Sequence, residues 1–340
     1  MRHDSTPALI FKDNNKENDM KYKRIGTDGP VISCLTLGTM MFGKTVDERS
    51  AKRIVDIATD RGITSIDTAG TYNFGESEII TGKAIAGNRS KIVLGSKVGY
   101  PLSGGIDTVN LSAEAVTGET EKALKRLGTD YLDILYLHAP DAKTPVYETL
   151  EAADRLVKSG KVLYIGISNY SAWQLAEMMC ISGSEQLTPI CVTQNIYNVL
   201  SRKIEAELVP CARHCGSGIM VYNPLAGGLL TGKYTGMNAG GGRLAWNDMY
   251  RRRFLNEANL AAVSTLKAAA EARGISLIEL AYRWCTSRDF IDSVLVGVSS
   301  AEQLESNLSL CGFEPLDEEL EACCEEQWKK VCGIAPDYSR

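Results

Sequence analysis

The feature that most constrains the fold of this chain is a regular alternation of two patterns: short, β-rich apolar runs and longer stretches with helical spacing of apolar residues. The alternation starts near Lys21 and continues almost to the end of the sequence. Such a pattern is typical of consecutive βα units whose strands form a parallel sheet. Eight strands are predicted in this way, at residues 32–38, 63–68, 91–98, 132–138, 162–168, 192–196, 219–223 and 293–298.

Eight βα units close naturally into a ring, so the sequence predicts an α/β fold, a parallel (β/α)8 barrel of the TIM type. The length of 340 residues suits such a barrel as a single domain, expected over residues 21–340 after a disordered N-terminal tail at 1–20. A doubly wound sheet is the rival architecture. The Gly-x-Gly-x-x-Gly fingerprint that often accompanies it is absent from the sequence, which favours the barrel.

The helical stretches have recognisable ends. The clearest helices are predicted at 47–61, 114–127 and 146–159, and Gly62, Gly128 and Gly160 stand where helices commonly terminate. Between the seventh and eighth strands, residues 226–292 are long enough for more than one helix. The glycine-rich segment 240–242 within them lacks a helical pattern and is a candidate lid loop. Extra C-terminal structure is predicted as a helix at 317–331.

The composition argues against several classes of function. Net charge is −5 and no basic stripe occurs, so neither nucleic acid nor an anionic membrane is an expected partner. The ten cysteines lack the paired spacing of a zinc site, so we expect reduced thiols and no metal. The first twenty residues contain no apolar signal segment and no stretch is long enough to span a membrane, which predicts a cytoplasmic protein.

Four ionisable residues occupy the positions where a parallel barrel places its active site, at the carboxyl ends of strands. Asp67 lies near the end of the second predicted strand, Tyr72 follows in the next loop, and Lys97 and His138 lie at the ends of the third and fourth strands. Each alone has a structural explanation, as a turn residue, a half-buried aromatic, a surface lysine or a core histidine. Together they indicate a site, because a Lys and an Asp in an apolar barrel mouth need each other to offset desolvation.

These residue types suit the reduction of a carbonyl group. A lysine ammonium beside a tyrosine hydroxyl is expected to lower the pKa of Tyr72 toward neutrality, as a general acid requires. Hydride addition develops negative charge on the carbonyl oxygen, which a tyrosine O–H and a histidine N–H can stabilise and protonate. We therefore expect Tyr72 to donate the proton, with His138 beside it.

The motifs around these residues resemble those of a known family, the aldo-keto reductases, whose catalytic tetrad is an Asp, a Tyr, a Lys and a His. The matching segments are Asp-Thr-Ala-Gly-Thr-Tyr at 67–72, Gly-Ser-Lys-Val at 95–98 and Tyr-Leu-His-Ala-Pro-Asp at 136–141. The resemblance covers nearly the whole chain after the tail. Within the family, segments 166–170 and 223–234 are similar to the aflatoxin aldehyde reductases, which also reduce succinic semialdehyde. The resemblance implies an NADPH-dependent reductase of a small-molecule aldehyde or ketone, which could form homodimers.

The resemblance also implies where NADPH binds. Ser168, Asn169 and Gln194 would hold its carboxamide, and Tyr222 would stack on the nicotinamide ring. On its residues alone the loop after the seventh strand is a turn or a phosphate site, and in the family it binds pyrophosphate. The start of the helix after the eighth strand binds the 2′-phosphate of the adenosine end. The cofactor-binding residues so implied are Gly38, Thr39, Met40, Asp67, Ser168, Asn169, Gln194, Tyr222, Asn223, Pro224, Leu225, Ala226, Gly227, Leu229, Lys233, Arg243, Val298, Ser299, Gln303, Ser306 and Asn307.

Substrate contacts carried over from the family are fewer. Arginines near the lid and the C-terminus face a substrate carboxylate in the aflatoxin aldehyde reductases, although a run such as 251–253 is also explained as a solvated surface. The sequence departs from that subgroup at the rim of the pocket (residues 70, 71, 73 and 74) and at residue 339, so another carbonyl substrate is open. The implied substrate residues are Tyr72, His138, Phe74, Arg251, Arg253 and Arg340.

Two alternative functions remain beside simple aldehyde reduction. One is a biosynthetic ketoreductase of secondary metabolism that acts on a bulky, polyketide-like carbonyl, an idea prompted by the rim residues. The other is an NADPH-sensing regulatory subunit with slow turnover, because proteins resembling the channel β-subunits keep the barrel and the cofactor. His138 argues against the sensor, since that subgroup generally lacks a histidine at this position.

Overall fold

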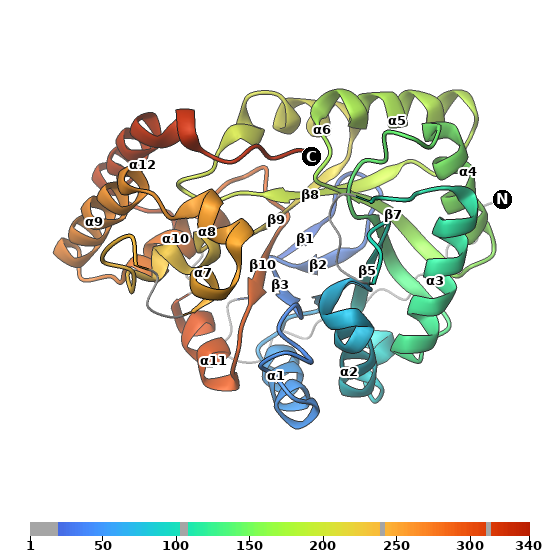
Figure 1. Cartoon of the computed structure of the whole chain (residues 1–340), viewed down its shortest axis with the longest axis horizontal. Coiled ribbons are helices and arrows are strands. Elements are labelled where there is room, and N and C mark those ends of the chain that lie inside the picture. Colours follow the sequence, from blue (N-terminus) through green and yellow to red (C-terminus); the bar gives the residue numbers. More distant parts are fainter. Residues whose placement is uncertain (1–19, 103–107, 239–241, 311–313) are drawn as a thin grey trace.

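The computed structural model describes residues 20–102, 108–238, 242–310 and 314–340. Within these residues, eight parallel strands form a closed barrel with helices around it, as the sequence predicts (Figure 1). Each barrel strand pairs with the strand of the next βα unit along the chain, and the last barrel strand closes the ring by pairing with the first. In order of pairing, the strands are β10 (Ser293–Gly297), β3 (Leu35–Gly38), β4 (Ser65–Asp67), β5 (Val93–Val98), β6 (Leu132–Leu137), β7 (Val162–Ser168), β8 (Ile190–Ile196) and β9 (Gly218–Tyr222).

The outer layer consists of helices that follow the strands. Asp47 caps the first of them by accepting a hydrogen bond from the Ser50 amide at 2.8 Å, and Gly62, just past its end, has a φ of +85° that suits glycine. The helices are α1 (Glu48–Asp60), α2 (Glu76–Ile85), α3 (Ala113–Leu127), α4 (Val146–Lys158), α5 (Ala172–Ser184), α6 (Leu208–Cys215), α7 (Arg243–Trp246), α8 (Asp248–Phe254), α9 (Glu257–Ala272), α10 (Leu277–Thr286), α11 (Ala301–Leu310) and α12 (Glu318–Val331).

Short turns of 3-10 helix complete the described structure, at η1 (Tyr72–Gly75), η2 (Arg89–Lys91), η3 (Lys203–Glu205), η4 (Ala226–Thr231) and η5 (Cys332–Ile334). The long stretch after the seventh barrel strand holds several helices, as predicted, from η4 to α10. Of the candidate lid at 240–242, only Gly242 belongs to the described residues, and the predicted tail lies outside them except for Met20. Among the described helices, none has the length and apolar content needed to cross a membrane.

The first predicted strand, 32–38, is wrong in its start. The chain instead forms an antiparallel hairpin of β1 (Tyr22–Arg24) and β2 (Val31–Ser33), and the barrel strand begins at Leu35. The break comes at Cys34, whose amide donates to the Lys21 carbonyl at 2.8 Å while its carbonyl accepts from the amide of Val294 in β10 at 2.9 Å, so that it joins the hairpin to the barrel strand. An apolar run of this length reads the same whether it is one strand or two, so periodicity alone could not separate them.

The hairpin closes the amino-terminal end of the barrel, which we call the floor. Ile25 and Ile32 are fully buried and pack with residues that point into the barrel interior. Figure 1 shows β1 and β2 at the centre of the ring of strands. The interior residues of this cluster are Ile134, Tyr136, Val192, Met220 and Leu295.

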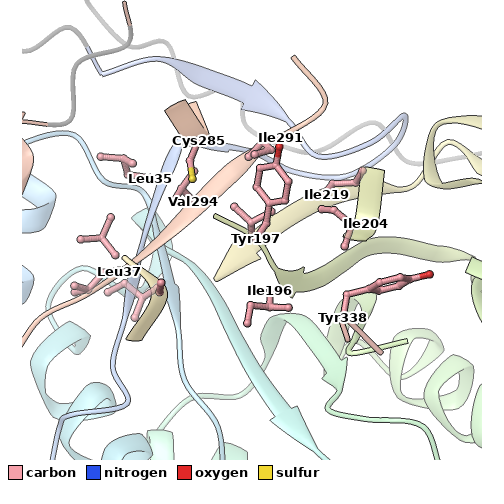
Figure 2. Close-up of a cluster of buried hydrophobic side chains, with 14 of the residues drawn as sticks. Leu35, Leu37, Ile196, Tyr197, Ile204, Ile219, Cys285, Ile291, Val294 and Tyr338 are labelled. Atoms are coloured by element: carbon pink, nitrogen blue, oxygen red, sulfur yellow. The ribbon is translucent and has the colours of Figure 1, made fainter. Parts of the chain in front are cut away.

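Alternation along each strand sorts side chains between the interior and the helices. Leu35, Leu37 and Val294 belong to the large core between strands and helices, part of which Figure 2 shows beside Cys285 of α10. Residues of the opposite parity point inward, where Tyr136 fills the middle of the barrel. The neighbouring strands have Gly95 and Gly166 there because an added Cβ would meet the Tyr136 ring at 2.9 and 2.6 Å.

Candidate active site

The carboxyl ends of the barrel strands surround a cavity of about 680 Å³, which we call the mouth. The strand register is staggered: Asp67 is opposite Gly95, two positions before Lys97, and Lys97 is opposite Tyr136, two positions before His138. On the next pair of strands, Ser168 is directly opposite Gln194. Such a stagger accompanies the tilt of strands in a closed barrel. Because side chains alternate along a strand, residues at the last inward position from different strands meet in one place. The site is thus a product of parity and strand length.

A buried ion pair lies beneath the cavity. Lys97 Nζ contacts Asp67 Oδ1, and the side chains of the two residues are only 1% and 3% exposed. The ammonium also donates to the Thr68 carbonyl at 3.0 Å and to the Tyr72 hydroxyl at 3.3 Å. Gln194 Nε2 donates to the second carboxylate oxygen of Asp67 at 3.0 Å. Every member of the pair is therefore hydrogen-bonded, as a buried charge requires.

The electrostatics of the pair differ from the sequence prediction in one respect. Burial is the largest single influence on Lys97 and would lower its pKa, but the charges of Asp67 and Tyr72 and the hydrogen bonds to both together outweigh it. The pKa is therefore raised and the ammonium persists. Burial raises the pKa of Tyr72 by more than the Lys97 charge lowers it, and the negative Asp67 adds to the rise. The expectation of a Tyr72 pKa lowered toward neutrality is therefore wrong for the protein without cofactor, because desolvation dominates. Tyr72 keeps its proton at neutral pH.

His138 follows directly after β6 and borders the same cavity. Its ring lies edge-on to the Tyr72 ring, with centroids 6.1 Å apart, and to Tyr100 at 4.9 Å. Burial, with the Lys97 and Arg340 charges, holds the pKa of His138 well below its usual range. The imidazole is therefore neutral at pH 7. Its Nδ1 is buried without a hydrogen-bond partner among the described residues, so this nitrogen is an unsatisfied polar atom beside the cavity.

A cluster of amide and hydroxyl groups forms the next part of the wall. Tyr222 donates to Asn169 Oδ1 at 2.7 Å, and Asn169 Nδ2 donates to the His138 carbonyl at 2.9 Å. Ser168 donates to the Gln194 carbonyl at 2.9 Å. Burial raises the pKa of Tyr222 to about 12, against the opposing charges of two arginines. These fixed donors and acceptors beside an aromatic face are suited to a planar amide such as a nicotinamide carboxamide.

The loop after β9 has the shape of an anion site. Asn223 and Ala226 have left-handed φ values of 61° and 48°, and Gly227 and Gly228 follow with 67° and 100°. Turns of this kind expose successive backbone amides to a ligand. Asn223 Nδ2 is buried without a partner among the described residues. These groups fit the phosphates of a dinucleotide, and the cavity wall also includes Lys233 and Arg243.

The structure gathers most of the predicted cofactor residues on the wall of the cavity. Ala226 and Leu229 do not line it, because their side chains are fully buried in the core, and Ser306 and Asn307 on α11 also lie outside it. Asn307 instead donates to the Tyr282 hydroxyl at 3.3 Å. The lining members are Gly38, Thr39, Met40, Asp67, Ser168, Asn169, Gln194, Tyr222, Asn223, Pro224, Leu225, Gly227, Lys233, Arg243, Val298, Ser299 and Gln303.

The arginines predicted to face the substrate separate into two groups. Arg340 and Arg253 line the cavity, whereas Arg251 is exposed and pairs with Asp248 at 2.5 Å outside it. Arg340 is held in place by its amide, which donates to the Asn169 carbonyl at 3.0 Å, and by its guanidinium, which donates to Tyr100 at 2.8 Å.

The wall residues that sequence reasoning did not find include Tyr100, Asn247, Met249 and Tyr250. Tyr100 lies two positions after β5, so the rule that placed Lys97 at a strand end could have found it. The other three are in or next to α8, in the long insertion before β10. No strand fixes their position, and the sequence pattern carries no signal for it.

Comparison with known proteins agrees with this geometry. Residues 34–328 match the model of the aldo/keto reductase family, which covers all eight barrel strands. The chain belongs to this family. Its members include oxidoreductases acting on carbonyl and alcohol groups, and this aldo/keto reductase is an enzyme of that class.

Curated relatives cover nearly the full length of this aldo/keto reductase. It is 36% identical over 323 residues to human aflatoxin B1 aldehyde reductase member 2, spanning 89% of each chain. It is 35% identical over 323 residues to human aldo-keto reductase family 7 member A3, spanning 89% of this chain and 96% of that one. It is also 35% identical over 306 residues to a probable voltage-gated potassium channel subunit β of Arabidopsis thaliana, spanning 87% and 93%.

Proposed function

We propose that this enzyme reduces an aldehyde or ketone to an alcohol with NADPH, and that Tyr72 donates the proton. The observation that carries the proposal is the buried Lys97–Asp67 pair with the Tyr72 hydroxyl 3.3 Å from the ammonium, next to the neutral His138. NADPH, when bound, supplies a hydride to the carbonyl carbon. The residues of the chain orient the carbonyl, exclude water and move one proton.

Each of the four residues has a distinct task in this proposal. Tyr72 gives the proton of its hydroxyl to the carbonyl oxygen as that oxygen gains negative charge. The Lys97 ammonium stabilises the tyrosinate that remains, and Asp67 keeps Lys97 charged. His138 donates a ring N–H to the same oxygen as a neutral imidazole. A raised pKa suits a donor that must arrive protonated, and the Lys97 ammonium beside the hydroxyl favours release of the Tyr72 proton to the carbonyl oxygen.

The choice of NADPH over NADH is proposed from the donors at the far end of the cavity. Lys233 and Arg243 supply positive charge, and Ser299 and Gln303 stand at the start of α11. The Ser299 amide and hydroxyl both meet Gln303 Oε1, at 2.8 and 3.0 Å, so a phosphate can replace that oxygen. Affinities for NADPH and NADH that are equal would contradict this assignment.

The central test is NADPH oxidation by the wild type and by Tyr72→Phe, with para-nitrobenzaldehyde and succinic semialdehyde as substrates. Loss of the proton donor should slow turnover by at least about 10²-fold, the lower range for general acid catalysis. The variant should still bind NADPH, which is measured by the quenching of protein fluorescence. Turnover that is unchanged in Tyr72→Phe would reject the role of this residue.

A carboxylate on the substrate is proposed from Arg340, which lines the cavity and is held there by Tyr100. In Arg340→Gln, the ratio of kcat/KM for succinic semialdehyde over para-nitrobenzaldehyde should fall about tenfold, the worth of one charge-assisted hydrogen bond. The matched control is Arg251→Gln, whose guanidinium pairs with Asp248 outside the cavity. An unchanged ratio in Arg340→Gln would reject the carboxylate contact.

A regulatory subunit that senses NADPH is the second candidate, because the relatives include a probable potassium channel subunit β. Such a protein would purify with cofactor bound and consume NADPH very slowly. The catalytic geometry around His138 favours the enzyme. Retention of cofactor through purification, combined with negligible oxidation across the aldehyde panel, would favour the sensor instead.

A further inference from the structure

Phe74 combines two properties that rarely occur together. It is the most exposed large apolar side chain among the described residues, at 74%, and it also borders the catalytic cavity. Only one residue separates it from Tyr72. An exposed ring contributes little to the stability of the folded chain, since most of its apolar surface remains in water. Its position therefore needs another explanation.

The backbone that carries Phe74 is held in an unfavourable conformation. Asn73 (φ 51°, ψ 45°) and Phe74 (φ 59°, ψ 33°) are both left-handed, and Gly75 follows with a φ of 89°. Left-handed geometry is common for glycine and tolerated by asparagine, but it is an outlier for a bulky residue. Of the three residues, Phe74 has the largest side chain, so its left-handed backbone should destabilise the folded state.

The turn is fixed by contacts on both sides. Asn73 Nδ2 donates to the carbonyls of Met40 and Phe42, at 3.0 and 2.7 Å, which ties the turn to the loop after β3. Gly75 has no room for a side chain, because an added Cβ would lie 2.8 Å from Cδ of Arg126. The ring of Phe74 is thus presented by a turn that both neighbours hold in place.

Other apolar side chains also line the cavity. Met40, Leu102 and Met249 line the cavity together with Phe74. Thioether side chains adapt their shape to an aromatic ligand, and an aromatic ring offers a face for stacking. The ionisable groups that handle the carbonyl, Asp67 and Lys97, are buried by contrast. The lining of the cavity therefore combines polar groups with exposed apolar side chains such as Phe74.

We infer that Phe74 is a specificity-determining residue, which stacks against an aryl or extended apolar group attached to the reacting carbonyl. This inference rests on the proposed reductase function. The substrate class it names is an aryl-bearing aldehyde or ketone whose carbonyl reaches Tyr72 while its ring lies on Phe74. Ordering of Phe74 against the substrate gives the ring the burial that it lacks in the free enzyme.

The test compares an elongated aryl substrate with a small one. The ratio of kcat/KM for para-phenylbenzaldehyde over propanal should fall about tenfold in Phe74→Ala, mainly through KM, and should be largely kept in Phe74→Trp. The control is Trp173→Ala, which removes another exposed aromatic, on α5 and outside the cavity, and should leave the ratio as it is. An equal loss for both aldehydes in Phe74→Ala would assign the residue a purely structural role and overturn the inference.

A binding experiment separates this inference from the reductase proposal. Para-phenylbenzamide has a carbonyl that does not accept hydride, and its Kd for the enzyme in excess NADP⁺ is measured by calorimetry. The Kd should rise about tenfold in Phe74→Ala. If the wild type reduces no carbonyl but the Kd still rises in Phe74→Ala, the reductase proposal is rejected and the role of Phe74 in binding an aryl group is kept. If the wild type is active but the Kd is unchanged in Phe74→Ala, the reductase proposal is kept and the role of Phe74 is rejected.

Stability gives an independent readout. Asparagine tolerates the left-handed region better than phenylalanine, so Phe74→Asn should unfold at a temperature no lower than the wild type while losing the aryl preference. A clear fall in the unfolding temperature would show that the ring stabilises the fold, and it would overturn the argument that Phe74 is kept for the substrate.

Discussion

The two ends of the barrel differ in how completely their buried polar side chains are hydrogen-bonded. At the floor, Thr36 shares hydrogen bonds with Ser65 at 2.6 Å and Ser293 at 2.7 Å, beneath which the hairpin residues Ile25 and Ile32 are fully buried. At the mouth, the Lys97–Asp67 ion pair is buried, His138 Nδ1 and Asn223 Nδ2 have no partners among the described residues, and the loops are strained.

Backbone strain is concentrated at one of these ends. Six non-glycine residues of the described chain have a positive φ, and all except Gln186 lie in loops at the mouth. The other five are Asn73, Phe74, Asn169, Asn223 and Ala226. Strain of this kind persists where the surrounding structure imposes it, and it clusters at functional sites. The comparison teaches that the floor is arranged for stability and the mouth for chemistry, as expected of this barrel.

The largest effect is expected from breaking the ion pair at the mouth. In Lys97→Met, the Asp67 carboxylate is left buried without its cation, which should destabilise the fold by about 3–5 kcal/mol. Turnover should be lost as well, because nothing then stabilises the tyrosinate. The free energy of unfolding in urea and the rate of NADPH oxidation measure the two effects separately.

The double variant Lys97→Met with Asp67→Asn sharpens this result. Neutralising both partners removes the unpaired charge, so more than half of the lost stability should return, while turnover stays absent. Recovery of stability without activity would identify the pair as a functional device. If Lys97→Met is as stable as the wild type, the mouth carries no such cost and the contrast with the floor fails.

At the floor we expect a smaller loss of stability, without the loss of activity expected at the mouth. Thr36→Val keeps the shape of the side chain but removes both of its hydrogen bonds to serine hydroxyls, which should lower the free energy of unfolding by about 1–3 kcal/mol. The kcat/KM for para-nitrobenzaldehyde should stay within about twofold of the wild type, because the change lies at the far end of the barrel. A large loss of activity would show that the two ends are coupled.

The sequence predicts the floor and the mouth unequally well. Period-two alternation and strand ends were enough to place Asp67 and His138 on the wall of one cavity and Lys97 beside Asp67, because parity and register are set by the strands themselves. The hairpin was missed because its second strand adjoins a barrel strand without a break in hydrophobicity. Tertiary packing, which decides burial, also decides the direction of the Tyr72 pKa shift, and no local pattern reports it.

Loops at the mouth were the least predictable part. The left-handed turn that presents Phe74 depends on Asn73 reaching carbonyls more than thirty positions earlier in the chain, at Met40 and Phe42. The wall contributed by Met249 and Tyr250 comes from a helix that has no counterpart in the βα repeat. The sequence therefore locates the chemistry more reliably than the shape of the space around it.

The smallest predicted effect concerns pH and belongs to the mouth alone. The pKa of His138 is held well below its usual 6.5 in the folded chain. Below about pH 6.5 this histidine therefore binds a proton in the unfolded chain but not in the folded one. The stability contributed by neutral His138 is thus complete above about pH 6.5 and is lost as the pH falls toward the folded-state pKa. Within this window the wild type should lose up to about 1.4 kcal/mol per pH unit more than His138→Gln, whose side chain does not titrate.

The measurement is the free energy of unfolding in urea at several pH values between about 5 and 8, for the wild type and His138→Gln. Taking the difference between the two profiles cancels the carboxylates, which both proteins share. His214→Gln, on the exposed surface of α6, serves as the comparison for loss of a histidine far from the cavity. Parallel profiles for the wild type and His138→Gln would mean that His138 binds its proton as easily in the fold as in the unfolded chain, which would contradict a pKa of His138 that burial at the mouth lowers.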